Sequence, residues 1–312
     1  MTRILFYLDE PGREMWQPAF EAAIPGLDFR SYPDWGSPDD GPAYVFAWKP
    51  ELGLIAKYPN IRAVFSLGAG IDHLTRDPSL PVDMPIIRMS DDGLKEGMAE
   101  FVLMNVLMHH RYMPRMQVAQ RKHEWKMLFP PRAKNVRVGI LGYGALGIAC
   151  AEALKPLNYQ IAAWSRTEKP AEHGIEHFTG DEQFNDFLAR TDILVGLLPS
   201  TPETTGLLNN KTLSLMPKHA SIINVGRGTL INLADLVSLL DSGHFSGATL
   251  DVFTKEPLAS DDPLWDHEKI YITPHIASIT RPETAAEYVA RNIKKIEAGQ
   301  QPENVLDRQR GY

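Results

Sequence analysis

Three glycines directly follow an apolar run of strand character. They are Gly142, Gly144 and Gly147, and they have the spacing G-x-G-x-x-G. A helix is predicted over Ala145–Leu154, directly after Gly144. In such a turn the first glycine lets the chain leave the strand sharply, the second lets a pyrophosphate approach the backbone, and the third lets the helix pack against the sheet. Free N–H groups and the positive dipole end at the start of the helix favour phosphate oxygens. This stretch therefore predicts a dinucleotide-binding site.

The end of the next predicted strand, Gln160–Trp164, indicates which dinucleotide binds. Proteins that bind NAD usually place Asp or Glu here to accept hydrogen bonds from the ribose hydroxyls. This chain has Ser165, Arg166 and Thr167 instead, and no acid before Glu168. A guanidinium pairs with a 2′-phosphate, and the two hydroxyls can donate to it. We therefore predict NADP(H) as the cofactor, with NAD(H) less favoured. If Arg166 is only a solvated surface residue, the protein does not discriminate between the two cofactors.

Glycines and polar residues also follow four further predicted strands, at residues 193–198, 221–224, 248–250 and 270–272. Ligands of open α/β sheets bind at the carboxyl ends of the strands, so these residues are expected to surround one site. The stretches concerned are Pro199-Ser200-Thr201, Gly226-Arg227-Gly228, Asp251 and Thr273-Pro274-His275.

The elements that must position these residues fall into two α/β groups. Residues 98–279 are predicted to form a Rossmann-type dinucleotide-binding domain with a doubly wound parallel sheet. It is inserted into a smaller, flavodoxin-like α/β substrate domain made of residues 1–97 plus 280–312. A long helical stretch is predicted over Glu96–Gln120, ending in a proline-broken basic segment, and a terminal helix over Arg281–Ala298.

The composition limits the classes of partner. The 312 residues are 44% hydrophobic and 23% charged with a net charge of -7, and no Lys/Arg block stands out, so we expect neither nucleic acid nor membrane as a partner. The single cysteine, Cys150, allows no intrachain disulfide. The first apolar run, Ile4–Leu8, has the length of a strand and not of a signal peptide, and we expect a cytoplasmic protein. No metal site is predicted.

Four separated motifs in the same order resemble the D-isomer-specific 2-hydroxyacid dehydrogenases, and the resemblance covers nearly the whole chain. Within this family the chain is most similar to the bacterial glyoxylate/hydroxypyruvate reductase A group. The four motifs are the glycine loop, Ile223-Asn224-Val225-Gly226-Arg227-Gly228, Asp251-Val252-Phe253-x-x-Glu256-Pro257-Leu258 and Thr273-Pro274-His275-Ile276-Ala277. Local features of the group are Phe65-x-Leu67-Gly68-Ala69-Gly70-x-Asp72, Trp164–Thr167, Ile279-Thr280-Arg281-Pro282 and Arg310-Gly311-Tyr312.

The resemblance implies an NADPH-dependent enzyme that reduces small 2-keto acids, glyoxylate to glycolate and hydroxypyruvate to D-glycerate. Hydride transfer to the keto carbon leaves an alkoxide that must be protonated, and His275 is the predicted general acid because an imidazole titrates near neutral pH. Glu256 is the implied partner that keeps the imidazole charged and oriented. Arg227 is predicted to bind the substrate carboxylate or keto oxygen and to stabilise the charge that develops.

The remaining predicted contacts follow from the resemblance and from the strand ends. The backbone N–H groups of Ala69 and Gly70 are a second carboxylate site, supplied by the other domain, and Trp48 is a pocket wall or else a core or interface residue. Asp251 either contacts the nicotinamide amide or caps its own turn. The predicted cofactor contacts are Gly142, Gly144, Ala145, Leu146, Gly147, Ser165, Arg166, Thr167, Leu198, Pro199, Thr204, Val225, Gly226 and Asp251; the predicted substrate contacts are Trp48, Ala69, Gly70, Arg227 and His275.

The sequence alone is also compatible with other functions. A phosphoglycerate or D-lactate dehydrogenase belongs to the same family, whereas formate dehydrogenases of the family carry Gln at the position of Glu256. A nicotinamide-sensing binding protein would use the fold without turnover, and it would not need Arg227, Glu256 and His275. A homodimer is expected from the resemblance, and the helical stretch Glu96–Gln120 suits a subunit contact.

Overall fold

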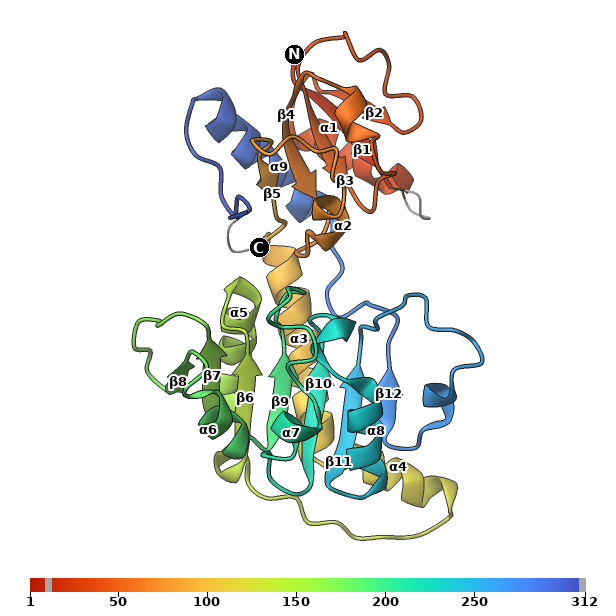
Figure 1. Cartoon of the computed structure of the whole chain (residues 1–312), viewed down its shortest axis with the longest axis vertical. Helices are drawn as coiled ribbons and strands as arrows, with labels where there is room; N and C mark the ends of the chain where they lie inside the picture. The colour runs from red at the N-terminus through yellow and green to blue at the C-terminus, as the bar shows by residue number, and fades with distance from the viewer. Residues whose placement is uncertain (9–12, 309–312) are drawn as a thin grey trace. The chain divides into compact units, whose positions relative to one another are not determined.

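The computed structural model describes residues 1–8 and 13–308 and divides the chain into two compact units (Figure 1). Unit 1 consists of Met1–Leu94 and Ile279–Tyr312, and unit 2 of Lys95–Ser278. The chain crosses between the units after residues 94 and 278, where the sequence predicted crossings after residues 97 and 279.

Unit 1 is built on a five-stranded parallel sheet. Its strands stand in the order β2-β1-β3-β4-β5, which is the flavodoxin-type order. The strands are β1 (Arg3–Tyr7), β2 (Asp28–Ser31), β3 (Ala43–Ala47), β4 (Ile61–Ser66) and β5 (Ile86–Ile87). Their pairing is parallel throughout, so their carboxyl ends share one edge.

Apolar side chains cover both faces of this sheet, as expected for parallel strands. On one face Phe6 and Phe46 pack with Phe20 of α1 (Trp16–Ala23) and Tyr288 of α9 (Pro282–Glu297). The C-terminal helix thereby belongs to the core of the N-terminal unit. The other face packs on the loops and short helices η2 (Ile55–Lys57) and α2 (Asp72–Thr75). The remaining short helix of this unit is η1 (Arg13–Met15).

Unit 2 contains a seven-stranded parallel sheet in the order β12-β11-β10-β9-β6-β7-β8 (Figure 1). The chain order reverses between β6 and β9, which is the switch point of a Rossmann-type sheet. The strands are β6 (Arg137–Leu141), β7 (Gln160–Ser165), β8 (Ile175–Thr179), β9 (Ile193–Gly196), β10 (Ala220–Asn224), β11 (Phe245–Leu250) and β12 (Ile270–Ile272).

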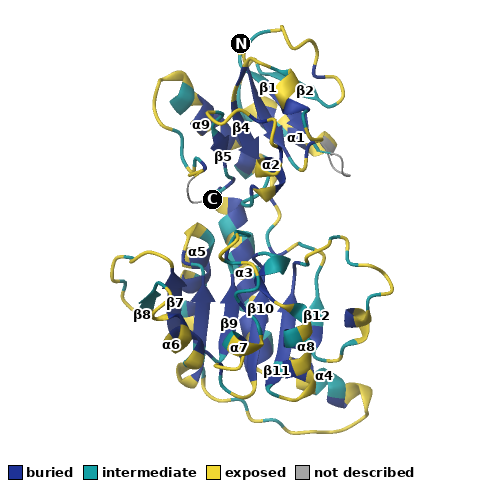
Figure 2. Cartoon of the chain, viewed as in Figure 1, coloured by how far each residue is buried: buried dark blue, intermediate teal, exposed yellow. Residues whose placement is uncertain are grey.

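Helices cover both faces of the second sheet, which confirms the doubly wound prediction. Val102 and Val106 of α3 (Asp92–His110) and Cys150 of α5 (Ala145–Leu154) share one apolar cluster. The opposite cluster contains residues of α6 (Phe184–Ala189), α7 (Asn210–Leu213) and α8 (Leu233–Asp241). Figure 2 shows the central strands between them as mostly buried, whereas the edge strands β8 and β12 are partly intermediate. The other helices are α4 (Met113–Arg121), η3 (Ala133–Asn135), η4 (Lys155–Leu157), η5 (Gly228–Leu230) and η6 (Pro263–Asp266).

The helical stretch predicted over Glu96–Gln120 forms two helices, and the break lies at Tyr112 and not at Pro114. Tyr112 has a left-handed backbone with φ of 58° and separates α3 from α4. Pro114 lies in the first turn of α4, where a missing N–H breaks no hydrogen bond, so the segment predicted as proline-broken is itself helical. The terminal motif Arg310-Gly311-Tyr312 lies outside the described residues. Within residues 1–8 and 13–308, no helix is both long and apolar enough to cross a membrane.

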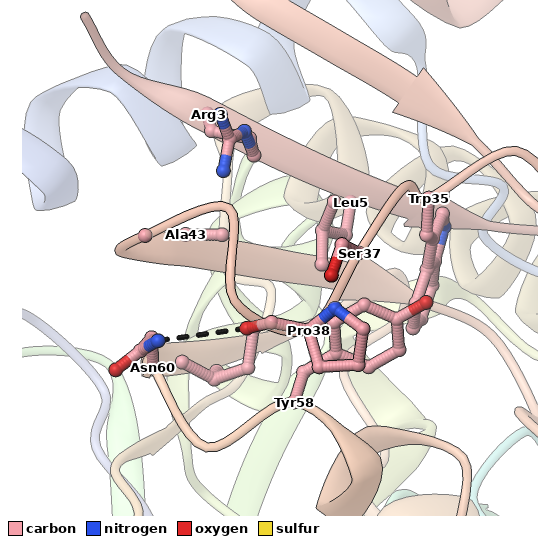
Figure 3. A pocket seen from close by; sticks show the side chains of 10 residues that line it. Arg3, Leu5, Trp35, Ser37, Pro38, Ala43, Tyr58 and Asn60 are labelled. Carbon is pink, nitrogen blue, oxygen red and sulfur yellow. Dashed lines mark hydrogen bonds between the residues drawn. The ribbon is translucent and has the colours of Figure 1, made fainter.

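Unit 1 contains a small cavity lined by residues of β1, β3, β4 and the 35–41 loop (Figure 3). Arg3, Ala43 and Ile61, which line it, are the first residues of β1, β3 and β4. The cavity therefore lies at the amino edge of the sheet, whereas ligands of such sheets bind at the carboxyl edge. We assign it to packing of the 35–41 loop, where Asn60 Nδ2 donates to the Pro38 oxygen at 3.5 Å.

Candidate active site

The glycine loop after β6 has the geometry that a pyrophosphate site requires. Gly142 has φ of +113°, and a Cβ on Gly147 would lie 2.2 Å from the Gly142 oxygen, so the protein's own packing demands both glycines. A Cβ on Gly144, in contrast, would meet nothing within 4 Å. The N-terminus of α5, which starts at Ala145, receives no side-chain cap from Gly144. The open side of Gly144 and the uncapped N–H groups fit dinucleotide phosphates.

At the end of β7 the three predicted residues play different structural parts. Ser165 is buried, and its hydroxyl donates to the Thr167 oxygen at 2.8 Å, so this proton is used within the turn. Arg166 and Thr167 are exposed. Hydrogen bonding to Thr201 is the main reason that the pKa of the Glu203 carboxyl is lowered, and the positive charge of Arg166 contributes. Arg166 therefore lies near the loop that follows β9.

The loops after β9 and β10 lie against the glycine loop. A Cβ on Gly142 would be 3.1 Å from the Leu197 carbonyl carbon, and one on Gly226 would be 2.8 Å from the Leu198 oxygen. Thr204 holds the β9 loop together, because its hydroxyl donates to the Pro199 oxygen at 2.6 Å. Three of the loops predicted to bind the cofactor therefore meet at the switch point of the sheet.

His275 and Glu256 are brought together as predicted. The two side chains meet at 2.8 Å between His275 Nδ1 and Glu256 Oε2, and they are 34% and 24% exposed. A carboxylate only accepts hydrogen bonds, so Nδ1 carries the proton and donates it. Glu256 Oε1 accepts the Phe253 N–H at 3.0 Å, which fixes the carboxylate. His275 therefore presents its second nitrogen, Nε2, away from Glu256.

Asp251 builds the turn that carries His275. The His275 backbone is left-handed, with φ of 58°, and its N–H donates to the Asp251 carbonyl oxygen at 2.9 Å. The Asp251 carboxylate accepts the Thr273 hydroxyl at 2.5 Å and the N–H groups of Ile276 and Ala277, both at 2.9 Å. Of the two roles predicted for Asp251, these contacts favour capping of the turn, while contact with the cofactor stays a prediction.

Arg227 is held by a residue that the sequence analysis did not assign to the site. Asn224, the last residue of β10, is 1% exposed; its Nδ2 donates to the Arg227 oxygen at 3.0 Å and its Oδ1 accepts the Gly226 N–H at 3.3 Å. The Arg227 Nη1 donates to the Gly226 oxygen at 2.8 Å. A polar residue at the end of a buried strand is the signal that could have identified Asn224.

Gly228 fixes the distance between the loops that carry Arg227 and Glu256. A Cβ on Gly228 would lie 2.0 Å from the Phe253 carbonyl carbon and 2.3 Å from the Thr254 nitrogen, so only glycine fits. The β10 loop therefore lies directly on the β11 loop. Because β10, β11 and β12 are neighbouring parallel strands, Arg227, Glu256 and His275 all extend from one edge of the sheet.

The three predicted residues of unit 1 lie together at the carboxyl ends of β3 and β4. The Ser66 hydroxyl donates to the Gly70 oxygen at 2.7 Å and accepts the Gly68 N–H at 3.3 Å, which orders the turn containing Ala69. The Trp48 ring covers Gly68, where a Cβ would be 2.9 Å from it, and lies 4.4 Å from the His73 ring between centroids. Packing within unit 1 thus accounts for Trp48, and the roles of Trp48, Ala69 and Gly70 toward substrate stay predictions.

Comparison with known proteins identifies the protein family. Residues 103–277 match the family profile described as D-isomer specific 2-hydroxyacid dehydrogenase, NAD binding domain. Glyoxylate/hydroxypyruvate reductase A of Serratia proteamaculans is 37% identical over 315 residues, covering 99% of both chains. The chain belongs to the D-isomer-specific 2-hydroxyacid dehydrogenases, as its motifs predicted.

Solved structures of similar proteins extend this comparison to the fold. A D-isomer specific 2-hydroxyacid dehydrogenase from Xanthobacter autotrophicus, crystallised with NADPH and MES, is 42% identical with a TM-score of 0.95, covering 100% of this chain and 99% of that one. An NADPH-dependent glyoxylate/hydroxypyruvate reductase from Sinorhizobium meliloti, crystallised with NADP and sulfate, is 34% identical with a TM-score of 0.91 and full coverage of both chains.

Proposed function

We propose that this protein is an NADPH-dependent reductase of small 2-keto acids that converts glyoxylate to glycolate and hydroxypyruvate to D-glycerate. The observation that carries the proposal is the His275–Glu256 pair, 2.8 Å apart, on the strand edge that also carries Arg227 and the glycine loop. The similarity to glyoxylate/hydroxypyruvate reductase A, at 37% identity over nearly the full length, supports this substrate class. Unit 2 is the dinucleotide-binding domain in this proposal, and unit 1 the substrate domain.

The chemistry divides between the cofactor and three side chains. NADPH, when bound, supplies the hydride that reduces the keto carbon. His275 donates the proton from Nε2 to the carbonyl oxygen as it becomes a hydroxyl, so that one hydride and one proton are added in total. Glu256 holds Nδ1 and stabilises the charged imidazolium before the transfer. The planar guanidinium of Arg227 pairs with the substrate carboxylate and stabilises the negative charge that develops on the keto oxygen.

A steady-state assay of NADPH consumption tests this function. Glyoxylate, hydroxypyruvate, pyruvate and 3-phosphohydroxypyruvate are compared with both cofactors, and glyoxylate and hydroxypyruvate are expected to give the highest kcat/KM. A higher value with 3-phosphohydroxypyruvate or pyruvate would replace the proposal by a phosphoglycerate or D-lactate dehydrogenase. Tight NADPH binding without consumption by any of the four acids would favour a nicotinamide-sensing protein.

The cofactor preference depends on Arg166, which is exposed at the end of β7. Charge-assisted hydrogen bonds to a phosphate are strong, so Arg166→Ala is expected to lower kcat/KM with NADPH by about 10- to 100-fold. NADH has no 2′-phosphate, so it makes no charge-assisted bond to Arg166, and its kcat/KM should change by less than about threefold. Lys169→Ala removes a charge from the same segment and serves as the control. An equal loss with both cofactors would contradict the assignment.

A second copy of the chain is the partner that we propose for an exposed apolar segment after α4. Trp125, Met127 and Phe129 are 99%, 70% and 80% exposed, and Figure 2 draws this segment mostly as exposed. Apolar side chains exposed side by side typically mark a protein interface. A solution mass near twice the 35.0 kDa of one chain is expected in light scattering, and a mass of one chain at micromolar concentration would contradict the homodimer.

We also propose a cytoplasmic location, as the sequence analysis predicted. The support is that the single cysteine, Cys150, is fully buried and that burial raises the pKa of its thiol to about 12. A buried thiol of this kind is inert toward disulfide formation.

A further inference from the structure

The segment that carries the cofactor-selecting residues, 166–174, joins β7 to β8 at the edge of the second sheet (Figure 1). At its start the Ser165 hydroxyl bonds the Thr167 oxygen, and near its end the Ile175 N–H donates to the Glu172 oxygen at 3.2 Å. These bonds fix the two ends of the segment along the sheet edge. Its position relative to the glycine loop depends on a further contact, made by the Glu172 side chain.

The Glu172 carboxylate binds two donors from outside the segment. Its Oε2 accepts the Tyr143 hydroxyl at 2.6 Å, and its Oε1 accepts Lys155 Nζ at 2.6 Å. Lys155 and then Tyr143 hold the pKa of this carboxyl down to about 2, so it is ionised at neutral pH. Hydrogen bonds to a charged acceptor are stronger than those between neutral groups.

Tyr143 is the residue between Gly142 and Gly144 and so belongs to the glycine loop. Its ring is 4% exposed, lies in the core with Cys150 and Leu154, and meets the His177 ring edge-on at 5.1 Å between centroids. Burial, together with Glu172, raises the pKa of the phenol, which therefore stays protonated and donates. A rigid side chain of the glycine loop thus holds the 166–174 segment through one hydrogen bond.

We propose that Tyr143 and Glu172 are positioning residues for cofactor selection, an inference that rests on the proposed NADPH function. The pyrophosphate and the 2′-phosphate of one NADPH molecule are separated by a covalent linkage of limited reach. A protein gains from both groups only if the glycine loop and Arg166 keep a matching separation. The Tyr143–Glu172 bond sets that separation. NADH has no 2′-phosphate and does not use Arg166, so its binding does not depend on the bond.

Direct binding of both cofactors to the purified full chain tests the inference. Tyr143→Phe keeps the ring in the core and removes only the hydroxyl; the NADPH Kd, from titration of nicotinamide fluorescence, is expected to rise about tenfold because a bond to a charged group is lost. The NADH Kd should stay within about twofold, since the ring packing is kept. Glu172→Gln, a second variant that weakens the same bond, should likewise raise the NADPH Kd and leave the NADH Kd within about twofold. Lys155→Met keeps the Tyr143–Glu172 bond and, as a partly exposed ion-pair change, should leave both constants nearly unchanged.

Two results would overturn the inference while leaving the proposed function intact. In one, Tyr143→Phe weakens NADH and NADPH equally, which would limit the hydroxyl to the shape of the glycine loop. In the other, the NADPH Kd and the NADH Kd of Tyr143→Phe both stay at the wild-type values. A wild-type protein that neither binds NADPH nor consumes it with glyoxylate would instead contradict the proposed function itself, before any variant is compared.

Discussion

Replacing His275 with alanine is expected to lower kcat for glyoxylate reduction by about 10²- to 10⁴-fold, the usual contribution of a general acid. The keto oxygen would then have to take its proton from water, which is neither held in place nor matched in pKa. The NADPH Kd should stay nearly unchanged, because the imidazole bonds Glu256 and the His275 backbone N–H bonds the Asp251 oxygen, whereas the glycine loop lies after β6. Single-turnover NADPH oxidation and a fluorescence titration measure the two quantities separately.

Glu256→Gln is the matched comparison for this prediction. The amide keeps the size of the side chain and still accepts a bond from His275 Nδ1, but it no longer stabilises the imidazolium. We expect a smaller loss of kcat than with His275→Ala. Near-normal turnover in His275→Ala would show that another group supplies the proton.

Replacing Arg227 with alanine is expected to raise the keto-acid KM and also to lower kcat. The guanidinium binds the substrate carboxylate in the ground state and faces growing charge on the keto oxygen in the transition state, so both constants are affected. Loss of such a charge-stabilising group costs about 10²- to 10³-fold in rate. Initial rates over a range of glyoxylate concentrations at saturating NADPH give the two constants.

Arg227→Lys distinguishes the effect of the positive charge from that of the planar guanidinium. Lysine keeps the positive charge but lacks the planar fork, so it should recover only part of the loss. The Asn224 contacts are to the backbone of residues 226 and 227, and they remain possible in both variants. A change in KM with kcat unaltered in Arg227→Ala would assign the residue to substrate binding alone.

The sequence predicted elements well where local signals were strong. The helix Ala145–Leu154 and the strand Ile270–Ile272 have the predicted bounds, because the glycine loop fixes the start of the first and turn residues flank the second. The edge strand β8 has no apolar run, and its alternation is weak, so it was missed. Helix α7 is a single turn held by an Asn209–Thr212 capping box, and it was also missed.

The site was predictable as a set of residues but not as a set of contacts. Residue type at a strand end pointed to His275 and the family resemblance pointed to Glu256, and parallel strands bring such residues to one edge. The bonds from Asp251 to Thr273 and to the 276–277 backbone depend on the register between β11 and β12, which no local pattern encodes. The Tyr143–Glu172 bond joins residues 29 apart and was missed for the same reason.

Transfer of deuterium from the cofactor to the product tests the central claim most directly. NADPH carrying deuterium at the transferable C4 position is incubated with hydroxypyruvate and the wild-type protein, and the product is analysed by mass spectrometry and chiral chromatography. The account predicts D-glycerate with one deuterium at C2 for each NADPH oxidised. Glycerate without deuterium, the L-isomer, or NADPH oxidation without glycerate would contradict it.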